Sequence, residues 1–197
     1  MNKAEKTRQF IIEKTAPVFN RKGFAGTSLN DLTEATGLTK GSIYGNFANK
    51  DEVALAVFDY NFAGLQKGVA TAISGSNSAI DKLLKMADFY RLEFKQTLAM
   101  GGCPILNTAI DADDTHPQLK EKVSASIRQW KKNIETIIKD GIMKGEVNPL
   151  VNASKFATQY IALIEGGIML AKTTGDVSML AASIERVKTI VSEELVT

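Results

Sequence analysis

The segment from Thr27 to Lys50, TSLNDLTEATGLTKGSIYGNFANK, carries two short helical patterns separated by a glycine. Ser28 begins a capping-box pattern, which starts the first helix. Gly37 follows where that helix must end, because glycine takes the left-handed conformation without a steric penalty. Thr39 can then cap the second helix. Two short helices joined by a glycine turn predict a helix-turn-helix over about residues 27–46, whose second helix fits a DNA major groove.

The second of these helices has two different faces. Ile43 and Phe47 are four residues apart, so they share one face, which we expect to be buried. Gly41 and Gly45 lie roughly opposite and would let the backbone approach a large partner closely. The residues that flank this bare strip carry a charge, a hydroxyl and a phenol: Lys40, Ser42 and Tyr44.

A further helix starts directly afterwards. Asn49, with Glu52 three residues later, forms another N-terminal capping pattern and places Lys50 in the first turn. Backbone N–H groups at a helix N-terminus together with a lysine favour phosphate binding. On spacing alone, a plain three-helix subdomain remains an alternative.

Charge is distributed unevenly along the chain. Residues 1–50 hold eight Lys/Arg and four Asp/Glu, a net charge of +4, whereas the whole chain carries +2, so residues 51–197 carry −2. A basic N-terminal segment on a nearly neutral body is typical of a nucleic-acid-binding module joined to a domain with another role.

The run GFAGTSLNDLTEATGLTKGSIYGNFANKDEVALAVF resembles the N-terminal domain of the tetracycline-repressor (TetR) family. The resemblance covers about sixty residues, and the matching positions are Gly23-Phe24, Thr27-Ser28, Leu32, Gly37-Leu38-Thr39, Tyr44, Phe47 and Lys50-Asp51-Glu52. One departure is Thr33, where the family usually has alanine. We expect the Thr33 hydroxyl to bond back to the Leu29 carbonyl.

The resemblance implies an all-α fold of nine helices. Residues 1–50 would form the DNA-binding domain, and residues 51–197 a ligand-binding and dimerisation domain. Base-edge and sugar-phosphate contacts are implied for Asn30, Lys40, Gly41, Ser42, Tyr44 and Asn46, and phosphate contacts for Thr27, Ser28 and Lys50. Phe47 is expected in the core.

The remainder of the chain supports the all-α class without reference to the family. Helical spacing predicts seven further helices, over about residues 3–22, 50–74, 80–100, 104–111, 117–144, 153–173 and 177–194. No run approaches about 20 apolar residues, and the N-terminus lacks an apolar signal core. A single cysteine fits a reducing compartment. We therefore expect a cytoplasmic protein that does not contact a membrane.

Two residue groups in the larger domain could indicate catalysis or a metal. Cys103 and His116 could form a nucleophile and base, but a buried small side chain and a helix cap explain them better. Asp111, Asp113 and Asp114 lie with His116 in a turn, which favours a solvated acidic turn over a metal site. The prediction is therefore no enzyme, no metal and no cofactor; a helical-bundle enzyme is the less favoured alternative.

Aromatic side chains recur along the larger domain, and the resemblance implies that its helices enclose an apolar cavity for an unknown small-molecule inducer. The candidate ligand-binding residues are Phe62, Phe89, Cys103, Trp130 and Tyr160. A DNA-binding regulator that has no ligand and acts through a protein partner is the alternative.

The last two helices, the eighth and ninth, are predicted to form a homodimer interface. Apolar residues recur at three- and four-residue steps in both helices: Phe156, Tyr160, Leu163, Gly167 and Leu170 in one, and Leu180, Ile184, Val187 and Val191 in the other. Gly166 and Gly167 would mark the closest approach of two subunits. The complete prediction is a dimeric repressor on palindromic, double-stranded operator DNA, released by its inducer.

Overall fold

The computed structural model describes residues 2–196, which form ten α-helices and, within that range, no strand. Its contacts group the chain into two compact units. The first unit contains Met1–Leu65 and Ala99–Ser124, and the second contains Gln66–Leu98 and Ala125–Thr197. The all-α prediction is confirmed. The grouping also joins a segment from the middle of the chain to the N-terminal residues, which a boundary at residue 50 does not anticipate.

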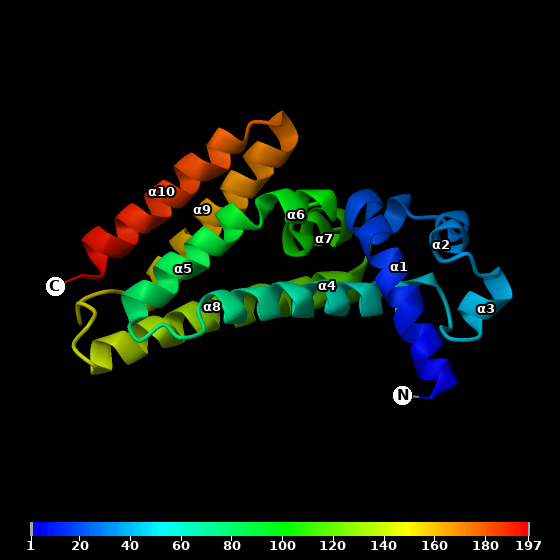
Figure 1. Cartoon of the computed structure of the whole chain (residues 1–197), viewed down its shortest axis with the longest axis horizontal. Coiled ribbons are helices and arrows are strands. Elements are labelled where there is room, and N and C mark those ends of the chain that lie inside the picture. Colours follow the sequence, from blue (N-terminus) through cyan, green and yellow to red (C-terminus); the bar gives the residue numbers. More distant parts are fainter. Residues whose placement is uncertain (1, 197) are drawn as a thin grey trace. The chain divides into compact units, whose positions relative to one another are not determined.

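The first unit contains the helices that Figure 1 draws in blue, cyan and part of the green. They are α1 (Lys3–Gly26), α2 (Leu29–Thr36), α3 (Lys40–Tyr44), the beginning of α4 (Lys50–Ala72), α7 (Pro104–Ala112) and the beginning of α8 (Pro117–Met143). Ile11, Leu32, Ile43 and Val53 are completely buried and form part of its core.

The predicted helix caps are present. The Ser28 hydroxyl accepts the Asp31 N–H, Thr39 does the same for Ser42, and Gly37 ends α2 with φ of 67°. These short-range bonds fix the length of both helices.

The prediction for Thr33 was wrong. Its hydroxyl donates to the Asn30 carbonyl at 2.9 Å, not to Leu29. A helical threonine can reach the carbonyl three or four residues before it, depending on its rotamer, and the spacing alone does not select one.

A break in α1 occurs at Gly23, directly after the predicted end of this helix at Lys22. Gly23 has φ of 72° and ψ of 177°, a conformation that only glycine adopts readily. The Phe24 N–H next to it donates to the Asp111 carboxylate of α7 at 2.5 Å. A Cβ on Gly23 would lie 2.5 Å from an Asp111 oxygen, so the break and the carboxylate require a glycine here.

Asn20 and Asn107 join α1 to the Gly-Gly segment before α7. The Asn20 side-chain amide donates to the carbonyls of Met100 and Gly102, each at 2.8 Å. The Asn107 amide donates to the Asn20 carbonyl at 2.9 Å and to the Gly101 carbonyl at 2.8 Å. Two side chains thereby satisfy backbone groups that a turn leaves without helical partners.

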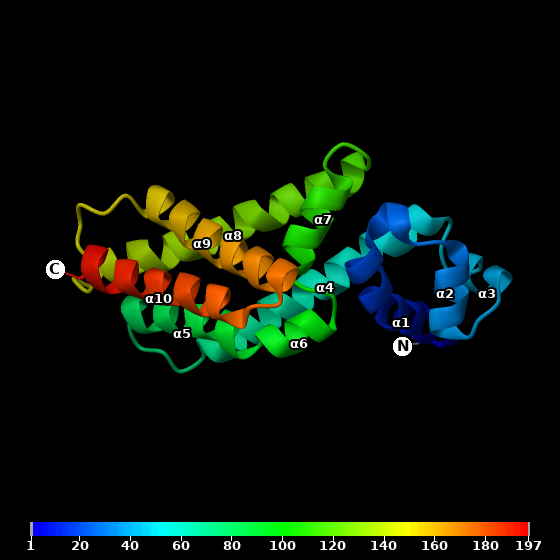
Figure 2. The same cartoon turned by 90° about the horizontal axis from the view of Figure 1, so that it is seen from above.

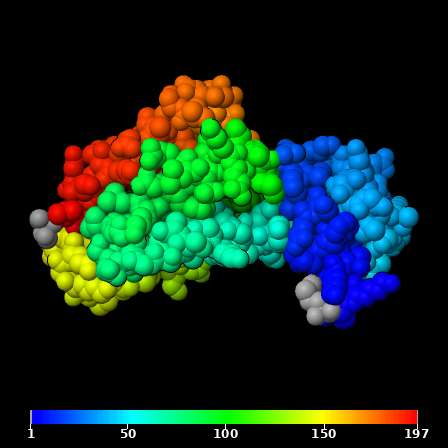
Figure 3. Space-filling model, in the orientation of Figure 1, coloured from blue at the N-terminus to red at the C-terminus, as the bar shows by residue number. Residues whose placement is uncertain are grey.

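The second unit is a bundle of long helices. It contains α5 (Ala79–Leu92), α9 (Ala153–Thr174), α10 (Val177–Glu194), most of α6 (Phe94–Ala99), the end of α4 and most of α8. Figures 1 and 2 show α9 and α10 side by side, and in Figure 3 the red surface of α10 adjoins the green surface of α5. Leu83, Ile138, Ile164 and Ile184 are completely buried between these helices.

The helix expected over residues 80–100 is interrupted. Glu93 has φ of −83° and ψ of 0°, and this ψ turns the chain out of the helical path. The Glu93 N–H still bonds the Phe89 carbonyl, and its own carbonyl accepts the Thr97 N–H. The result is two helices, α5 and α6, which is why ten are found where nine were expected.

Most residues predicted for the dimer interface are used inside the subunit. Seven of the nine are buried: Phe156, Tyr160, Gly167, Leu180, Ile184, Val187 and Val191. A Cβ on Gly167 would lie 2.7 Å from the Ser183 side chain of α10, so Gly167 serves the close packing of α9 on α10. The prediction for these seven residues was wrong, because their stripes pack within one subunit.

A different face of α9 is open. Met169 and Leu170 are 48% and 43% exposed, and a Cβ on Gly166 would meet nothing within 4 Å. Over residues 2–196, no helix is long and apolar enough to cross a membrane.

We predict that Gly23→Ala destabilises the protein by about 2–4 kcal/mol, because the new methyl group meets Asp111 and the backbone conformation becomes strained. Urea unfolding followed by circular dichroism measures the change. Gly64→Ala is the control, since this helical position is open and alanine favours a helix there. Equal stability of Gly23→Ala and the wild type would contradict the role given to this break.

Candidate nucleic-acid interface

Three buried side chains hold α2 and α3 together. Leu32 and Ile43 are completely buried, and Phe47 is 2% exposed. Ile43 and Phe47 share the inner face, as their spacing predicted, so Phe47 belongs to the core. The opposite face of α3 is consequently turned away from the core.

Lys40 and Tyr44 lie one turn apart on α3 and are available to a partner. The Lys40 ammonium lies 6.0 Å from the centre of the Tyr44 ring. Within the described residues, neither the ammonium nor the phenol hydroxyl makes a hydrogen bond or a salt bridge. An exposed cation and a phenol donor on one helix suit phosphate oxygens and base edges.

The two glycines of α3 differ in their surroundings. A Cβ on Gly41 would meet only the Thr39 hydroxyl, at 4.0 Å, so the space beside Gly41 is open. A Cβ on Gly45 would lie 3.2 Å from the Gly41 carbonyl oxygen, which is a local constraint at the end of the helix. The bare strip predicted for both glycines is therefore open at Gly41.

Ser42 and Asn46 are linked to each other. The Asn46 amide donates to the Ser42 carbonyl at 2.9 Å, and both residues are half-buried. Asn30 and Ser28 are exposed at the start of α2, with the Ser28 hydroxyl donating to Asp31 at 2.8 Å.

Thr27 and Lys50, both predicted as phosphate contacts, face the interior of the protein. Thr27 is 1% exposed, and its hydroxyl donates to the Gly23 carbonyl at 2.6 Å. The Lys50 ammonium donates to the carbonyls of Phe24 and Thr27, each at 2.9 Å, and lies 4.2 Å from the centre of the Phe24 ring. In this arrangement both side chains bind backbone groups of their own chain.

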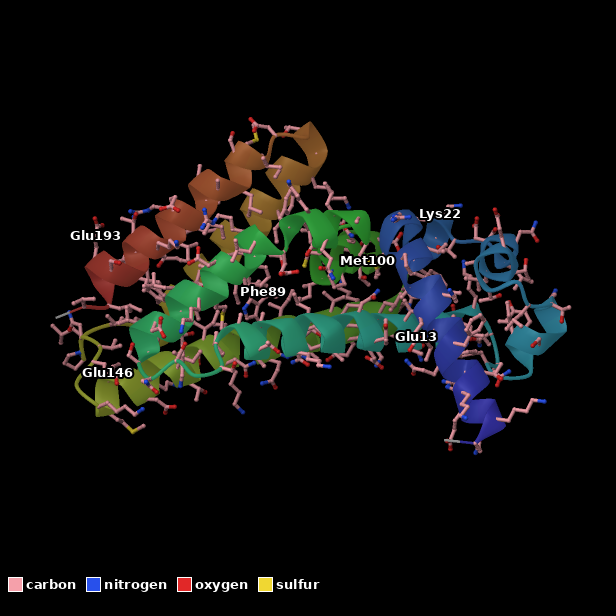
Figure 4. All side chains as sticks on the ribbon, viewed as in Figure 1. Glu13, Lys22, Phe89, Met100, Glu146 and Glu193 are labelled. Carbon is pink, nitrogen blue, oxygen red and sulfur yellow. The ribbon has the colours of Figure 1, made fainter. Side chains whose placement is uncertain are left out.

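Asp31 connects the α2 cap to α1. Hydrogen bonds from Lys22, at 2.5 Å, and then from the Ser28 N–H and hydroxyl lower the pKa of Asp31 to about 2. Figure 4 labels Lys22 near the end of α1. The ionised carboxylate thereby links the start of α2 to the end of α1 through a surface ion pair.

Arg8 of α1 was missed by the sequence patterns. Its guanidinium donates to the Asn46 carbonyl at 2.5 Å and to Glu52 at 2.7 Å, and lies 3.9 Å from the centre of the Phe47 ring. The Ala48 N–H and then Arg8 lower the pKa of Glu52. Arg8 is about forty residues away from these partners, so no local pattern indicates it.

The predicted ligand-binding residues fall in both units. In the first unit, Phe62 stacks on Phe58 with ring centres 6.2 Å apart, and Cys103 is buried at the start of α7. In the second unit, Phe89 and Trp130 join one aromatic cluster through Tyr90. These assignments to a ligand stay predictions.

Tyr160, the fifth candidate, is completely buried in the second unit. Its hydroxyl donates to the Leu83 carbonyl at 2.6 Å, and burial raises its pKa well above the usual range. The phenol is therefore neutral, and its hydroxyl hydrogen is engaged in this hydrogen bond. In this state Tyr160 has a structural role.

His116 caps α8, as predicted. Its Nδ1 accepts the Leu119 N–H at 3.1 Å, and its Nε2 lies 3.5 Å from Asp51. Asp111, the first of the acidic residues, accepts the Phe24 N–H. Across the part of the chain that the structure describes, no three His, Cys, Asp or Glu residues are placed to hold a metal ion.

Comparison with known proteins gives two matches to family descriptions. Residues 11–57 match "Bacterial regulatory proteins, tetR family", and residues 79–187 match "Tetracyclin repressor-like, C-terminal domain". Together they cover most of both units.

Solved structures and characterised relatives agree with these matches. A TetR-family regulator from Cytophaga hutchinsonii is 44% identical, with a TM-score of 0.93 over 100% of this chain and 98% of that chain. Another from Chloroflexus aurantiacus is 37% identical, with a TM-score of 0.95 over 100% and 99%. The repressor DhaR from Mycobacterium sp. GP1 is 24% identical over 84% of this chain and 82% of that protein. The chain therefore belongs to the TetR family of helix-turn-helix transcriptional regulators.

Proposed function

We propose that this regulator is a dimeric repressor that binds a palindromic operator through α3 and leaves it when a small molecule binds. The observation that carries the DNA contact is the outer face of α3. It offers the Lys40 ammonium, the Tyr44 hydroxyl and an open backbone at Gly41, none of which serves the core. Because Thr27 and Lys50 bind their own backbone, we assign phosphate contact mainly to Lys40, Tyr44 and the exposed start of α2.

Two subunits are required for specific recognition, since one helix-turn-helix of this size reads too few base pairs. We assign the contact between subunits to the outer face of α9. This face combines Met169 and Leu170 with the small residues Ala162 and Gly166 at helical spacing. Two such stripes about a two-fold axis can pack closely and bury their apolar side chains.

A single helix, α4, offers a route from ligand to DNA. It begins at Lys50, whose ammonium donates to the Phe24 carbonyl in the last turn of α1, and it ends at Ala72. Near its end, a Cβ on Gly68 would lie 2.7 Å from the Phe89 ring, so the backbone of α4 touches this ring directly. A ligand that moves α4 would change the separation of the two α3 helices, and operator half-sites tolerate little change in spacing. Repression, rather than activation, is supported by the relative DhaR, whose name describes it as a transcriptional repressor.

Selection from a random DNA library with the purified protein tests the proposed function. We expect enrichment of an inverted repeat whose half-sites lie on successive major grooves. The same protein–DNA complex, titrated with salt, should weaken steeply as counterions reoccupy the phosphates. Recovery of no common sequence would contradict the proposal.

We predict that Lys40→Ala and Tyr44→Phe each weaken operator binding by about 1–3 kcal/mol, because each removes one contact that the fold does not use. Gel-shift titrations at fixed salt measure the change, and unchanged melting temperatures confirm intact folding. Wild-type affinity in both variants would place the DNA-contacting surface elsewhere.

Gly41→Ala should also weaken operator binding, by tenfold or more, while folding at least as stably as the wild type. Its methyl group enters open space in the free protein and meets DNA only in the complex. Gly64→Ala is the matched control, a helical glycine with equally open surroundings in α4. A Gly41→Ala protein with undiminished affinity would show that DNA does not approach this backbone closely.

Gly166→Arg should convert the dimer to a monomer and abolish tight operator binding. A Cβ at this position meets nothing within 4 Å in its own subunit, so we expect the long side chain to extend away from α9 and the monomer to fold. Gly167→Arg is unsuitable, since it would clash with Ser183 in the same chain. Analytical ultracentrifugation measures the assembly, with Gly64→Arg as the control that stays dimeric. A dimeric Gly166→Arg protein would exclude the α9 face as the interface.

A further inference from the structure

Trp130 of α8 carries a buried hydrogen-bond donor that the protein leaves unused. The side chain is 7% exposed, and its indole Nε1 is inaccessible and has no hydrogen-bond partner among the described residues. Leaving such a donor buried and unpaired destabilises the folded protein. Tyr160 in the same unit shows the ordinary outcome, since its buried hydroxyl donates to Leu83 at 2.6 Å.

Trp130 belongs to an aromatic cluster. Trp130 stacks on Tyr90 of α5, with ring centres 5.4 Å apart and planes inclined by 28°. Tyr90 meets the edge of Phe89 at 5.4 Å. Figure 4 labels Phe89 on the side of α5 that faces α4. This aromatic cluster of Phe89, Tyr90 and Trp130 therefore offers flat, apolar surfaces beside one N–H group.

The residues one helical turn from Trp130 on α8 are uncharged. One turn before it lies Ser126, and one turn after it lies Ile134, and both are buried. An indole N–H can only donate, so the group that completes it must be an acceptor. A charged acceptor such as a carboxylate needs a cationic partner when it is buried, which neither of these two neighbours provides. An ordered water needs two to four polar partners, and of the two buried α8 residues one turn away only Ser126 has a polar side chain.

We infer that Trp130 donates its indole N–H to the carbonyl oxygen of an uncharged, planar, conjugated ligand that packs against the aromatic cluster. This inference rests on the proposed ligand-responsive function and gives the chemical class of the inducer. The planar ring system matches the stacked rings, and the carbonyl oxygen matches the single unused donor.

The aromatic cluster also touches the helix that the response requires. The Phe89 ring lies so close to Gly68 that a Cβ there would be 2.7 Å away, with no side chain between ring and backbone. A ligand that displaces Phe89 therefore pushes directly on α4. The Phe89 ring thus links ligand binding at the aromatic cluster to movement of α4.

The test uses a matched pair of probes, 1-tetralone and tetralin, which share a bicyclic shape but differ in the carbonyl group. The chain contains one tryptophan, so a ¹⁵N–¹H spectrum shows a single indole resonance. We expect 1-tetralone to shift this resonance downfield and to bind about tenfold more tightly than tetralin, the value of one hydrogen bond to an otherwise unpaired donor. Trp130→Phe keeps an aromatic ring but removes the donor, and it should bind both probes equally.

Equal affinity of both probes for the wild type, an unmoved indole resonance, or no binding of 1-tetralone would overturn the inference. A Trp130→Phe protein that still prefers 1-tetralone would do the same. Operator binding by the same wild-type preparation separates this result from the proposed function. A protein that binds operator but ignores 1-tetralone retains its proposed role with a different ligand class, whereas loss of sequence-specific DNA binding removes the role itself. If Trp130→Phe fails to fold, the wild-type spectrum with both probes still decides the matter.

Discussion

The Lys50 ammonium joins the start of α4 to the turn between α1 and α2. It donates to the backbone carbonyls of Phe24 and Thr27, each at 2.9 Å, after the break at Gly23, and the Phe24 carbonyl also accepts the Thr27 N–H. Because Lys50 is also the first residue of α4, one charged group fixes the start of α4 against the turn that leads into α2. These two hydrogen bonds from a charged donor stabilise the geometry of this turn.

The same turn is fixed from the other side by Asp111. Its carboxylate accepts the Phe24 N–H, and the missing side chain of Gly23 leaves room for the carboxylate, since a Cβ there would lie 2.5 Å from an Asp111 oxygen. The Asn20 and Asn107 amides add a second connection between α1 and the segment before α7. Residues between 80 and 87 positions apart thus join α7 and the segment before it to α1 through hydrogen bonds.

The comparison of Lys40 with Lys50 shows why a motif identifies a surface better than it identifies contacts. Both lysines stand in the first turn of a helix and both fit a phosphate role by pattern. The Lys50 ammonium is taken up by carbonyls brought in by α1, whereas the Lys40 ammonium makes no hydrogen bond or salt bridge within the described residues. The apolar residues of α9 and α10 give a second example. Their spacing fits a contact between subunits, but the two helices pack together and bury most of them within one subunit. The partner of a side chain is decided by what folds against it.

The sequence by itself determined the all-α class, the capped ends of α2, α3 and α4, the turn at Gly37 and the inward side of Ile43 and Phe47. These features depend on hydrogen bonds and spacings within about four residues, so they are readable along the chain. Only the tertiary structure decided which donors remain available for DNA, where Arg8 binds, and which face of α9 is open. These outcomes depend on groups from distant segments competing for the same partners, and local spacing carries no information about that competition.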